Sequence, residues 1–293
     1  MTLIAHERGG ARVTEYILTL RCLDAPGITH ATASGLLDVG ANILEQSQFA
    51  HPEHRLLCVR TRFETDEESA AVVRDAISAR VERFDPAIWL RPAGEHRRAL
   101  LMVSKLDHCL VDLLYRWQIG ELPVDIPLIV SNHPDLRALA DRVAIPFVHI
   151  PVTKETKPEA EAELLELVAK HEIDVVVLAR YMQVLSDDLC TKLSARVINI
   201  HHSFLPGFKG ARPYHQAYDR GVKLIGATAH FVTSELDEGP IIEQDVQRVS
   251  HAQSAESLVE IGRDVERRVL SRAVRLWAED RVFLTGTRTV VFA

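Results

Sequence analysis

The sequence predicts an α/β protein of two domains. The first is a small βαββαβ domain with helices on one face of an antiparallel sheet, and the second is a larger domain with a doubly wound, mostly parallel sheet. Strand-like and helix-like segments follow the order βαββαβ over residues 13–90, and strands alternate with helices from residue 99 to the end at residue 293. Between them, residues 91–98 (RPAGEHRR) are charged and contain Pro and Gly, which is typical of a linker.

Length and composition narrow the class of protein. A chain of 293 residues suits one large or two ordinary domains. Its net charge of -7 argues against a general nucleic-acid binder, although a local basic patch for an anionic substrate is compatible with it. The four cysteines are scattered without a CxxC pair, which favours reduced thiols in a cytoplasmic protein. We expect no membrane span and no secretory signal, and we expect residues 1–12 to be a disordered tail.

The N-terminal domain is predicted from short alternating segments and turn residues. A turn at residues 24–27 (DAPG) precedes a helix with an apolar stripe, which Gly40 ends. A second helix is expected over residues 67–81. The expected strands are residues 13–22, 43–50, 56–63 and 87–90.

The C-terminal domain shows a regular alternation of apolar strands with helices. The expected strands are residues 99–103, 126–130, 147–150, 173–179 and 197–200, and the helices are about 109–117, 135–143, 158–171 and 186–193. Sites in such sheets lie outside the carboxyl ends of the strands, where Asn199, His201 and the turn at residues 180–183 fall. A last helix, residues 256–277, is expected to contribute packing and charge but no chemistry.

The segment from residue 197 to residue 245 carries the candidate catalytic residues. Asn199 and His201 are two apart near a strand end, so their side chains share one face. Asp237 lies in a loop before Gly239. An imidazole can transfer a proton near neutral pH, an amide NH2 can stabilise an oxyanion, and a carboxylate can orient the imidazole or hold a water. This set suits acyl transfer to water or to an amine without a Ser or Cys nucleophile.

Two simpler interpretations compete with this one. Asn199 can be a turn former, His201 a buried structural histidine and Asp237 a solvated turn residue. Alternatively, Asp237 can join a metal site with His201, His202, His215 and His230. No two of these histidines have HxxxH spacing and no Cys joins them, so we expect no metal and no cofactor.

The second half of the chain resembles the folate-dependent formyltransferase family. The resemblance lies in four short motifs: residues 199–201 (NIH), 203–206 (SFLP), 230–232 (HFV) and 236–240 (LDEGP). It implies that Asn199, His201 and Asp237 are catalytic. It also implies that residues 99–293 form the catalytic domain.

The first half resembles an ACT domain, a small-molecule regulatory module with a ferredoxin-like βαββαβ fold. The resemblance lies in Gly35 and Gly40 followed by residues 41–43 (ANI), after the turn at residues 24–27. It implies that Asp24 and Asn42 help to bind an amino-acid effector, glycine or methionine, in a homo-oligomer. The alternative is a purely structural dimerisation domain.

The acceptor of the formyl group is the open question. Family members that use glycinamide ribonucleotide have a Gly-rich phosphate loop after the first strand and a Pro after the catalytic His, whereas this chain has residues 104–109 (SKLDHC) and His202. Without glycine, backbone amides cannot approach a phosphate as closely. The resemblance therefore implies hydrolysis of 10-formyltetrahydrofolate to formate and tetrahydrofolate, supplying formate for purine biosynthesis and balancing the one-carbon folate pool. The alternatives are an amine-acceptor formyltransferase and a catalytically inactive ACT sensor.

Two further segments are expected at the site. The resemblance implies that Met182, Gln183, Val184 and Leu185 line the pterin pocket, and the role of the Gln183 side chain stays open because related enzymes have Arg there. The first strand of the second domain is followed by Ser104, Lys105 and His108. These residues either limit the space in which a formyl acceptor would bind or are solvated turn residues. Arg212 either contacts an anion or lies at a helix start.

Overall fold

The computed structural model describes residues 13–207 and 213–293, which form two compact units. One contains the residues up to His96 together with Phe292–Ala293, and the other is Arg97–Val291. The expected tail over residues 1–12 and the candidate Arg212 lie outside the described residues.

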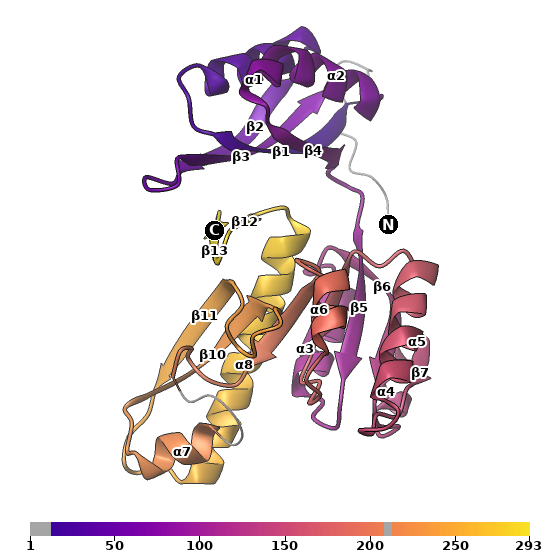
Figure 1. Cartoon of the computed structure of the whole chain (residues 1–293), viewed down its shortest axis with the longest axis vertical. Helices are drawn as coiled ribbons and strands as arrows, with labels where there is room; N and C mark the ends of the chain where they lie inside the picture. The colour runs from indigo at the N-terminus through magenta and orange to yellow at the C-terminus, as the bar shows by residue number, and fades with distance from the viewer. Residues whose placement is uncertain (1–12, 208–212) are drawn as a thin grey trace. The chain divides into compact units, whose positions relative to one another are not determined.

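The first unit confirms the βαββαβ prediction (Figure 1). Its antiparallel sheet has the strand order β2-β3-β1-β4. Helices α1 and α2 approach closely at Gly35, where a Cβ would lie 2.7 Å from the Cα of Ile77. The elements are β1 (Thr14–Leu23), α1 (Ile28–Asp38), β2 (Asn42–Ala50), β3 (Leu56–Thr65), α2 (Ala70–Val81), the 3-10 helix η1 (Glu82–Phe84) and β4 (Ala87–Pro92).

The described residues of the second unit form a seven-stranded sheet of order β11-β10-β9-β8-β5-β6-β7. Strands β7, β6, β5, β8 and β9 are parallel, and β10 and β11 add an antiparallel pair at one edge. The strands are β5 (Arg97–Val103), β6 (Val124–Ser131), β7 (Phe147–His149), β8 (Val175–Leu178), β9 (Val197–His201), β10 (Leu224–Phe231) and β11 (Ile241–Arg248), with a hairpin β12 (Val282–Thr285) and β13 (Arg288–Val291). The helices are α3 (His108–Gln118), α4 (Arg137–Arg142), α5 (Lys157–Lys170), α6 (Asp187–Lys192), α7 (Pro213–Asp219) and α8 (Ala255–Ala278).

Helices cover both faces of this sheet, which confirms the doubly wound prediction. Because strand side chains alternate, Leu101 and Val103 of β5 pack with α3 and α8, whereas Leu100 and Met102 pack with α5 and α6. The sheet is therefore buried on both sides, and its strand ends remain as the place for a site.

The structure differs from the sequence prediction at the linker and at the C-terminal edge. Pro92 still pairs with Tyr16 in β4, and Arg98 already belongs to β5, so only residues 93–96 separate the two strands. The strands β11 to β13 were not among the expected elements, whereas α7 begins at Pro213, where a helix start was one of the two interpretations of the segment with Arg212. Strand β11 is mostly exposed and polar, which leaves little apolar alternation to reveal it.

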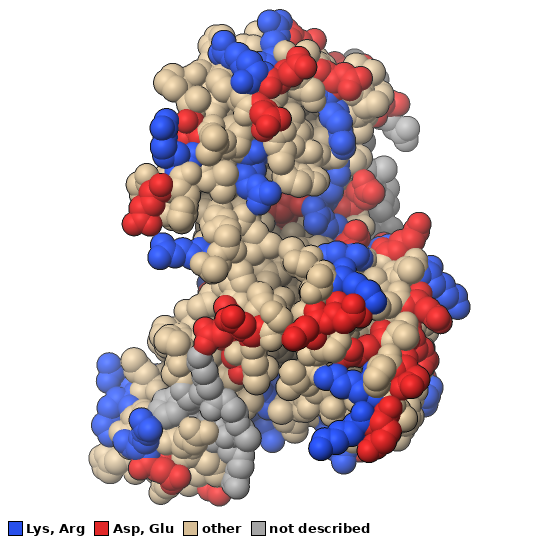
Figure 2. Space-filling view, in the orientation of Figure 1, with Lys and Arg blue, Asp and Glu red and all other residues tan. Residues whose placement is uncertain are grey.

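The surface and the helices agree with the composition. Acidic and basic side chains are interspersed over the face drawn in Figure 2. Among the described residues, every helix is too short or too polar to cross a membrane. The four cysteines are buried and free.

Candidate active site

A cavity of about 510 Å³ opens at the carboxyl ends of the parallel strands, in the second unit. Its wall is built from the segments after β8 and β9, the loop after β10, and the helices α3, α7 and α8. The expected residues Asn199, His201, Asp237 and His108 line it, and so do all four residues from Met182 to Leu185. A cavity of this size with convergent polar groups at one end suits a small organic ligand.

The three expected catalytic residues converge on the wall of the cavity. In β9, Ile198 and Ile200 face the apolar core, so Asn199 and His201 face the other way. The Nδ1 atom of His201 lies 3.2 Å from Oδ1 of Asp237, and the two side chains are 5% and 8% exposed. The sequence thus predicted a set of side chains that the fold brings together.

The environment keeps Asp237 ionised and leaves one atom of His201 available. Burial by itself raises the pKa of Asp237, but the hydrogen bond from His201 and the nearby imidazoles outweigh it, so the pKa lies below its ordinary value. An ionised carboxylate only accepts hydrogen bonds, so the facing Nδ1 of His201 carries a proton. The buried Nε2 of His201 has no hydrogen-bond partner among the described residues, and its lone pair is available for proton transfer.

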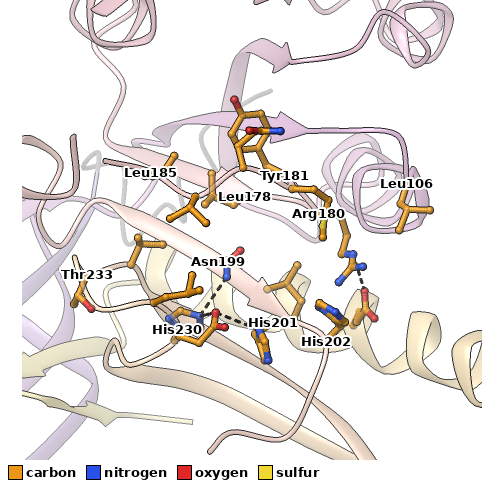
Figure 3. A pocket seen from close by; sticks show the side chains of 18 of the residues that line it. Leu106, Leu178, Arg180, Tyr181, Leu185, Asn199, His201, His202, His230 and Thr233 are labelled. Carbon is orange, nitrogen blue, oxygen red and sulfur yellow. Dashed lines mark hydrogen bonds and ion pairs between the residues drawn. The ribbon is translucent and has the colours of Figure 1, made fainter. Parts of the chain in front are cut away.

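His230 orients Asn199 across the antiparallel strands. The register of β9 and β10 places these two residues directly opposite each other. Nδ1 of His230 lies 2.9 Å from the carbonyl oxygen of Phe231 and donates to it, so Nε2 accepts from the Asn199 amide at 3.3 Å. Burial lowers the pKa of His230, which keeps it neutral in this role. Figure 3 draws the contact between Asn199 and His230 as a dashed line. The second N–H of the Asn199 amide remains for an oxyanion.

The loop that carries Asp237 is held by Gly239. Asp237 has a positive φ of 59°, and a Cβ at Gly239 would lie 1.7 Å from the carbonyl oxygen of Phe231. The next residue, Pro240, accepts a backbone hydrogen bond from Phe231 at 2.9 Å. Only glycine lets the loop lie this close to the end of β10, and this contact sets the position of the carboxylate.

We expect Gly239→Ala to displace Asp237 and to lower kcat about 100-fold. The clash should also reduce the free energy of unfolding by about 2 kcal/mol, measured by urea denaturation. Gly286→Ala is the control, because Gly286 has φ 70° in the β12–β13 turn with open space around it, and it should lose about 1 kcal/mol without loss of kcat. Equal kcat in the two variants would show that Gly239 does not set the site.

Another part of the cavity wall is formed by the segment from Met182 to Leu185, whose Met182 and Val184 side chains are exposed. Two serines fix this segment. The Met182 backbone N–H donates to Oγ of Ser104 at 2.9 Å, and the hydroxyl of Ser104 donates to Asn132 at 2.7 Å. Ser186 accepts from the N–H of Leu189 and starts α6.

Several candidates lie away from the cavity. Ser104 is buried and supports the segment from behind, and Lys105 is exposed, so neither is part of the cavity wall. Of the turn before α3, Leu106 does line the cavity, as does His108 at the start of the helix. Asp24 and Asn42 belong to the first unit, where Asn42 is exposed and donates to Glu64 at 3.0 Å.

Helix α8, which was expected to contribute packing and charge but no chemistry, brings a buried carboxylate to the cavity wall. Glu266 Oε2 lies 2.8 Å from Nε2 of His108 and 3.4 Å from Nε of Arg180, and its Oε1 accepts from the hydroxyl of Tyr214 at 2.8 Å. Burial raises the pKa of Glu266, but His108 and Arg180 outweigh it, and the pKa is lowered overall. The sequence did contain a sign of this buried carboxylate, because Glu266 is a charged residue within the apolar stripe of the helix, next to Val265.

His202 lies between His201 and this carboxylate. Its ring is 5.1 Å from the ring of His201 and 6.2 Å from that of Tyr214, and Figure 3 shows it between His201 and Arg180. Burial, and then the charge of Arg180, lower the pKa of His202 to about 3. His202 is therefore neutral at physiological pH.

A neutral His202 should make the protein less stable in mild acid. Its folded pKa lies below the ordinary value near 6.5, so the unfolded state binds more protons as the pH falls from about 6.5 toward 3. The stability contribution is complete above pH 6.5 and declines below it. Urea unfolding at a series of pH values should show a smaller pH dependence for His202→Gln than for wild type, and an equal dependence would contradict the assignment.

Two groups of side chains among the described residues could hold a metal ion: His51, Glu53 and His54, and His108, Cys109 and Glu266. The first group is in the turn between β2 and β3 of the first unit. In the second, burial raises the pKa of Cys109 well above its usual value, and the Arg180 guanidinium already neutralises Glu266, which disfavours a cation there.

The fold and the site together define a folate-dependent formyl-transfer class of protein. The sequence pattern of the formyl transferase family matches residues 97–274. The formyltetrahydrofolate deformylase of Corynebacterium sp. (strain P-1) is 49% identical over 278 residues, covering 94% of this chain and 97% of the relative. The chain belongs to the formyltetrahydrofolate deformylase family.

Solved structures agree with this assignment. The formyltetrahydrofolate deformylase of Burkholderia mallei ATCC 23344 is 48% identical, with a TM-score of 0.92 over 96% of this chain and 100% of that chain. The glycinamide ribonucleotide transformylase 1 of Symbiobacterium toebii is 31% identical, with a TM-score of 0.64 over 69% of this chain and 97% of that chain. Both units of this chain thus have counterparts in a deformylase, whereas the match to the transformylase covers a smaller part.

Proposed function

We propose that the protein hydrolyses 10-formyltetrahydrofolate to formate and tetrahydrofolate. One observation carries the proposal: Asn199, His201 and ionised Asp237 converge on the wall of a cavity large enough for a pterin. The name of the relatives that match over 94% of the chain supports the substrate.

The pterin ring lies beside the segment from Met182 to Leu185, whose backbone offers donors and acceptors and whose apolar side chains pack on the ring. This orientation directs the N10-formyl group toward His201. The exposed Met182 and Val184 become covered when the folate binds.

In the chemical step, a water molecule attacks the formyl carbon while Nε2 of His201 accepts its proton. Asp237 stabilises the imidazolium that forms. The amide of Asn199 stabilises the tetrahedral oxyanion, which typically contributes about 3 kcal/mol. His201 then returns the proton to N10, the C–N10 bond breaks, and formate and tetrahydrofolate leave.

The direct test is release of formate from 10-formyltetrahydrofolate by the purified protein, with and without glycinamide ribonucleotide. Equal amounts of formate and tetrahydrofolate in the absence of an acceptor support the hydrolase. Turnover that requires the ribonucleotide would establish an amine-acceptor transferase instead, and absence of turnover in both reactions would favour the sensor alternative.

We propose no metal requirement, because the proposed steps use only side chains and water. Activity should then be unchanged after treatment with a chelator. Loss of activity that returns on adding a divalent cation would reverse this proposal.

For the first unit we propose an ACT domain that binds glycine or methionine through Asp24 and Asn42 in a cytoplasmic homo-oligomer. The βαββαβ fold is compatible with this role. The formate produced would supply purine biosynthesis. Calorimetric titration with each amino acid, compared with Asn42→Ala, tests the effector, because a binding site that uses Asn42 loses affinity in the variant.

A further inference from the structure

The carboxylate of Glu266 is a suitable binding point for an amine acceptor. Its side chain is 2% exposed, it lies on the cavity wall, and its lowered pKa keeps it charged. An amine N–H would gain a charge-assisted hydrogen bond there. The fold itself does not exclude an amine, since a glycinamide ribonucleotide transformylase shares it.

In this chain the carboxylate is already occupied by protein donors. Tyr214 donates to Oε1, while His108 and Arg180 face Oε2 at 2.8 and 3.4 Å. A carboxylate offers about four acceptor positions, and hydrogen bonds from Tyr214 and His108 take two of them, while Arg180 is an ion-pair partner without a hydrogen bond. The guanidinium of Arg180 also compensates the negative charge, so little attraction for a further cation remains.

The space beside the carboxylate is filled as well. One turn before Glu266 on α8, a Cβ at Gly262 would lie 2.1 Å from Cζ of Tyr214, so only glycine allows the tyrosine ring to lie against the helix. His202 occupies the space between this ring and His201. The protein therefore fills the wall nearest the catalytic imidazole with its own side chains.

We propose that the Glu266 cluster (Glu266, His108, Tyr214 and Arg180) restricts the formyl acceptor to water by occupying the position where an amine would bind. The inference rests on the proposed hydrolase function. Aminolysis would follow the same course as hydrolysis: the amine nitrogen bonds to the formyl carbon, the C–N10 bond breaks, and the proton given up by the amine passes to N10. Only the acceptor differs, so the wall beside the reacting carbon decides the product.

The test compares products from 10-formyltetrahydrofolate in the presence of glycinamide, a small primary amine. Wild type should form formate with little N-formylglycinamide. In the double variant His108→Ala/Tyr214→Phe the carboxylate loses two donors, and the ratio of N-formylglycinamide to formate should rise about tenfold, as expected for one freed charge-assisted hydrogen bond. Mass spectrometry of both products gives the ratio.

Two variants make the test specific. Adding Glu266→Gln to the double variant should abolish the increase, because the amine then loses its anionic partner. Val232→Ala enlarges the same cavity at a position that packs with Leu189 and Val197 and not with the group around Tyr214, and it should keep the wild-type ratio. Tyr214→Phe alone preserves the ring against Gly262 and should show a smaller increase, which covers the case in which the double variant fails to fold.

The outcomes separate this inference from the proposed function. Hydrolysis by wild type together with an unchanged ratio in folded Tyr214→Phe and in the double variant would overturn the role of the Glu266 cluster. An equal increase in Val232→Ala would also overturn it, because cavity size alone would then decide the acceptor. Absence of formate from wild type would refute the hydrolase itself.

Discussion

The kcat for formate release should fall about 10³-fold when His201 is replaced by glutamine, with little change in KM. The imidazole is the group that accepts the proton of the attacking water and returns it to N10, and glutamine cannot do either. In the proposed binding mode the folate is held mainly beside Met182 to Leu185, which His201→Gln leaves intact, so its affinity should persist. Steady-state kinetics of formate release give both constants.

His171→Gln is the matched control, because it removes a histidine of the same unit at the C-terminal end of α5, outside the cavity wall. Its kcat should equal that of wild type. A kcat for His201→Gln within tenfold of wild type would exclude His201 as the proton-transfer group.

Asp237→Asn should lower kcat by a similar factor, about 10³-fold, although the side chain keeps its size. The amide can donate to Nδ1 of His201, which leaves the proton on Nε2, where the lone pair is needed. The imidazolium also loses its negative partner 3.2 Å away. When kcat is measured as a function of pH, it should be reduced at every pH of the plateau over which the wild-type kcat is constant. A kcat near the wild-type value would refute the assignment.

The same substitution has a defined effect on stability. Because the folded pKa of Asp237 is below its ordinary value, its stabilising contribution is present above about pH 4 and is lost as the pH falls through the folded pKa. Asp237→Asn should therefore be less stable than wild type at pH 7, and the difference should shrink in acid. Urea unfolding at pH values above and below 4 measures this, and a constant difference would argue against a lowered pKa.

Periodicity allowed most of the fold to be predicted, because buried parallel strands such as β8 are continuous apolar runs. The polar edge strand β11 and the hairpin β12–β13 gave no comparable signal. Strand β11 is mostly exposed, so its sequence is under little pressure to alternate. The linker was predicted too long because a proline and an arginine are typical of linkers, whereas in the fold Pro92 pairs with Tyr16 and Arg98 pairs with Asp125 in neighbouring strands.

The predictable part of the site was the part encoded locally. Asn199 and His201 share a strand end, and Asp237 lies in a loop marked by Gly239. The role of His230 depends on the register between β9 and β10, which one strand does not reveal. The pair of His108 and Glu266 spans 158 positions and exists only because α3 packs on α8.

The central claim is that water bound at Asn199, His201 and Asp237 is the direct formyl acceptor. A single turnover in ¹⁸O-labelled water, with enzyme in excess over 10-formyltetrahydrofolate, tests it most directly. Direct attack predicts formate with one labelled oxygen and an unlabelled Asp237 carboxylate. Unlabelled formate, with the label found in Asp237 after proteolysis and mass spectrometry, would show that the carboxylate itself attacks the formyl group and would contradict the claim.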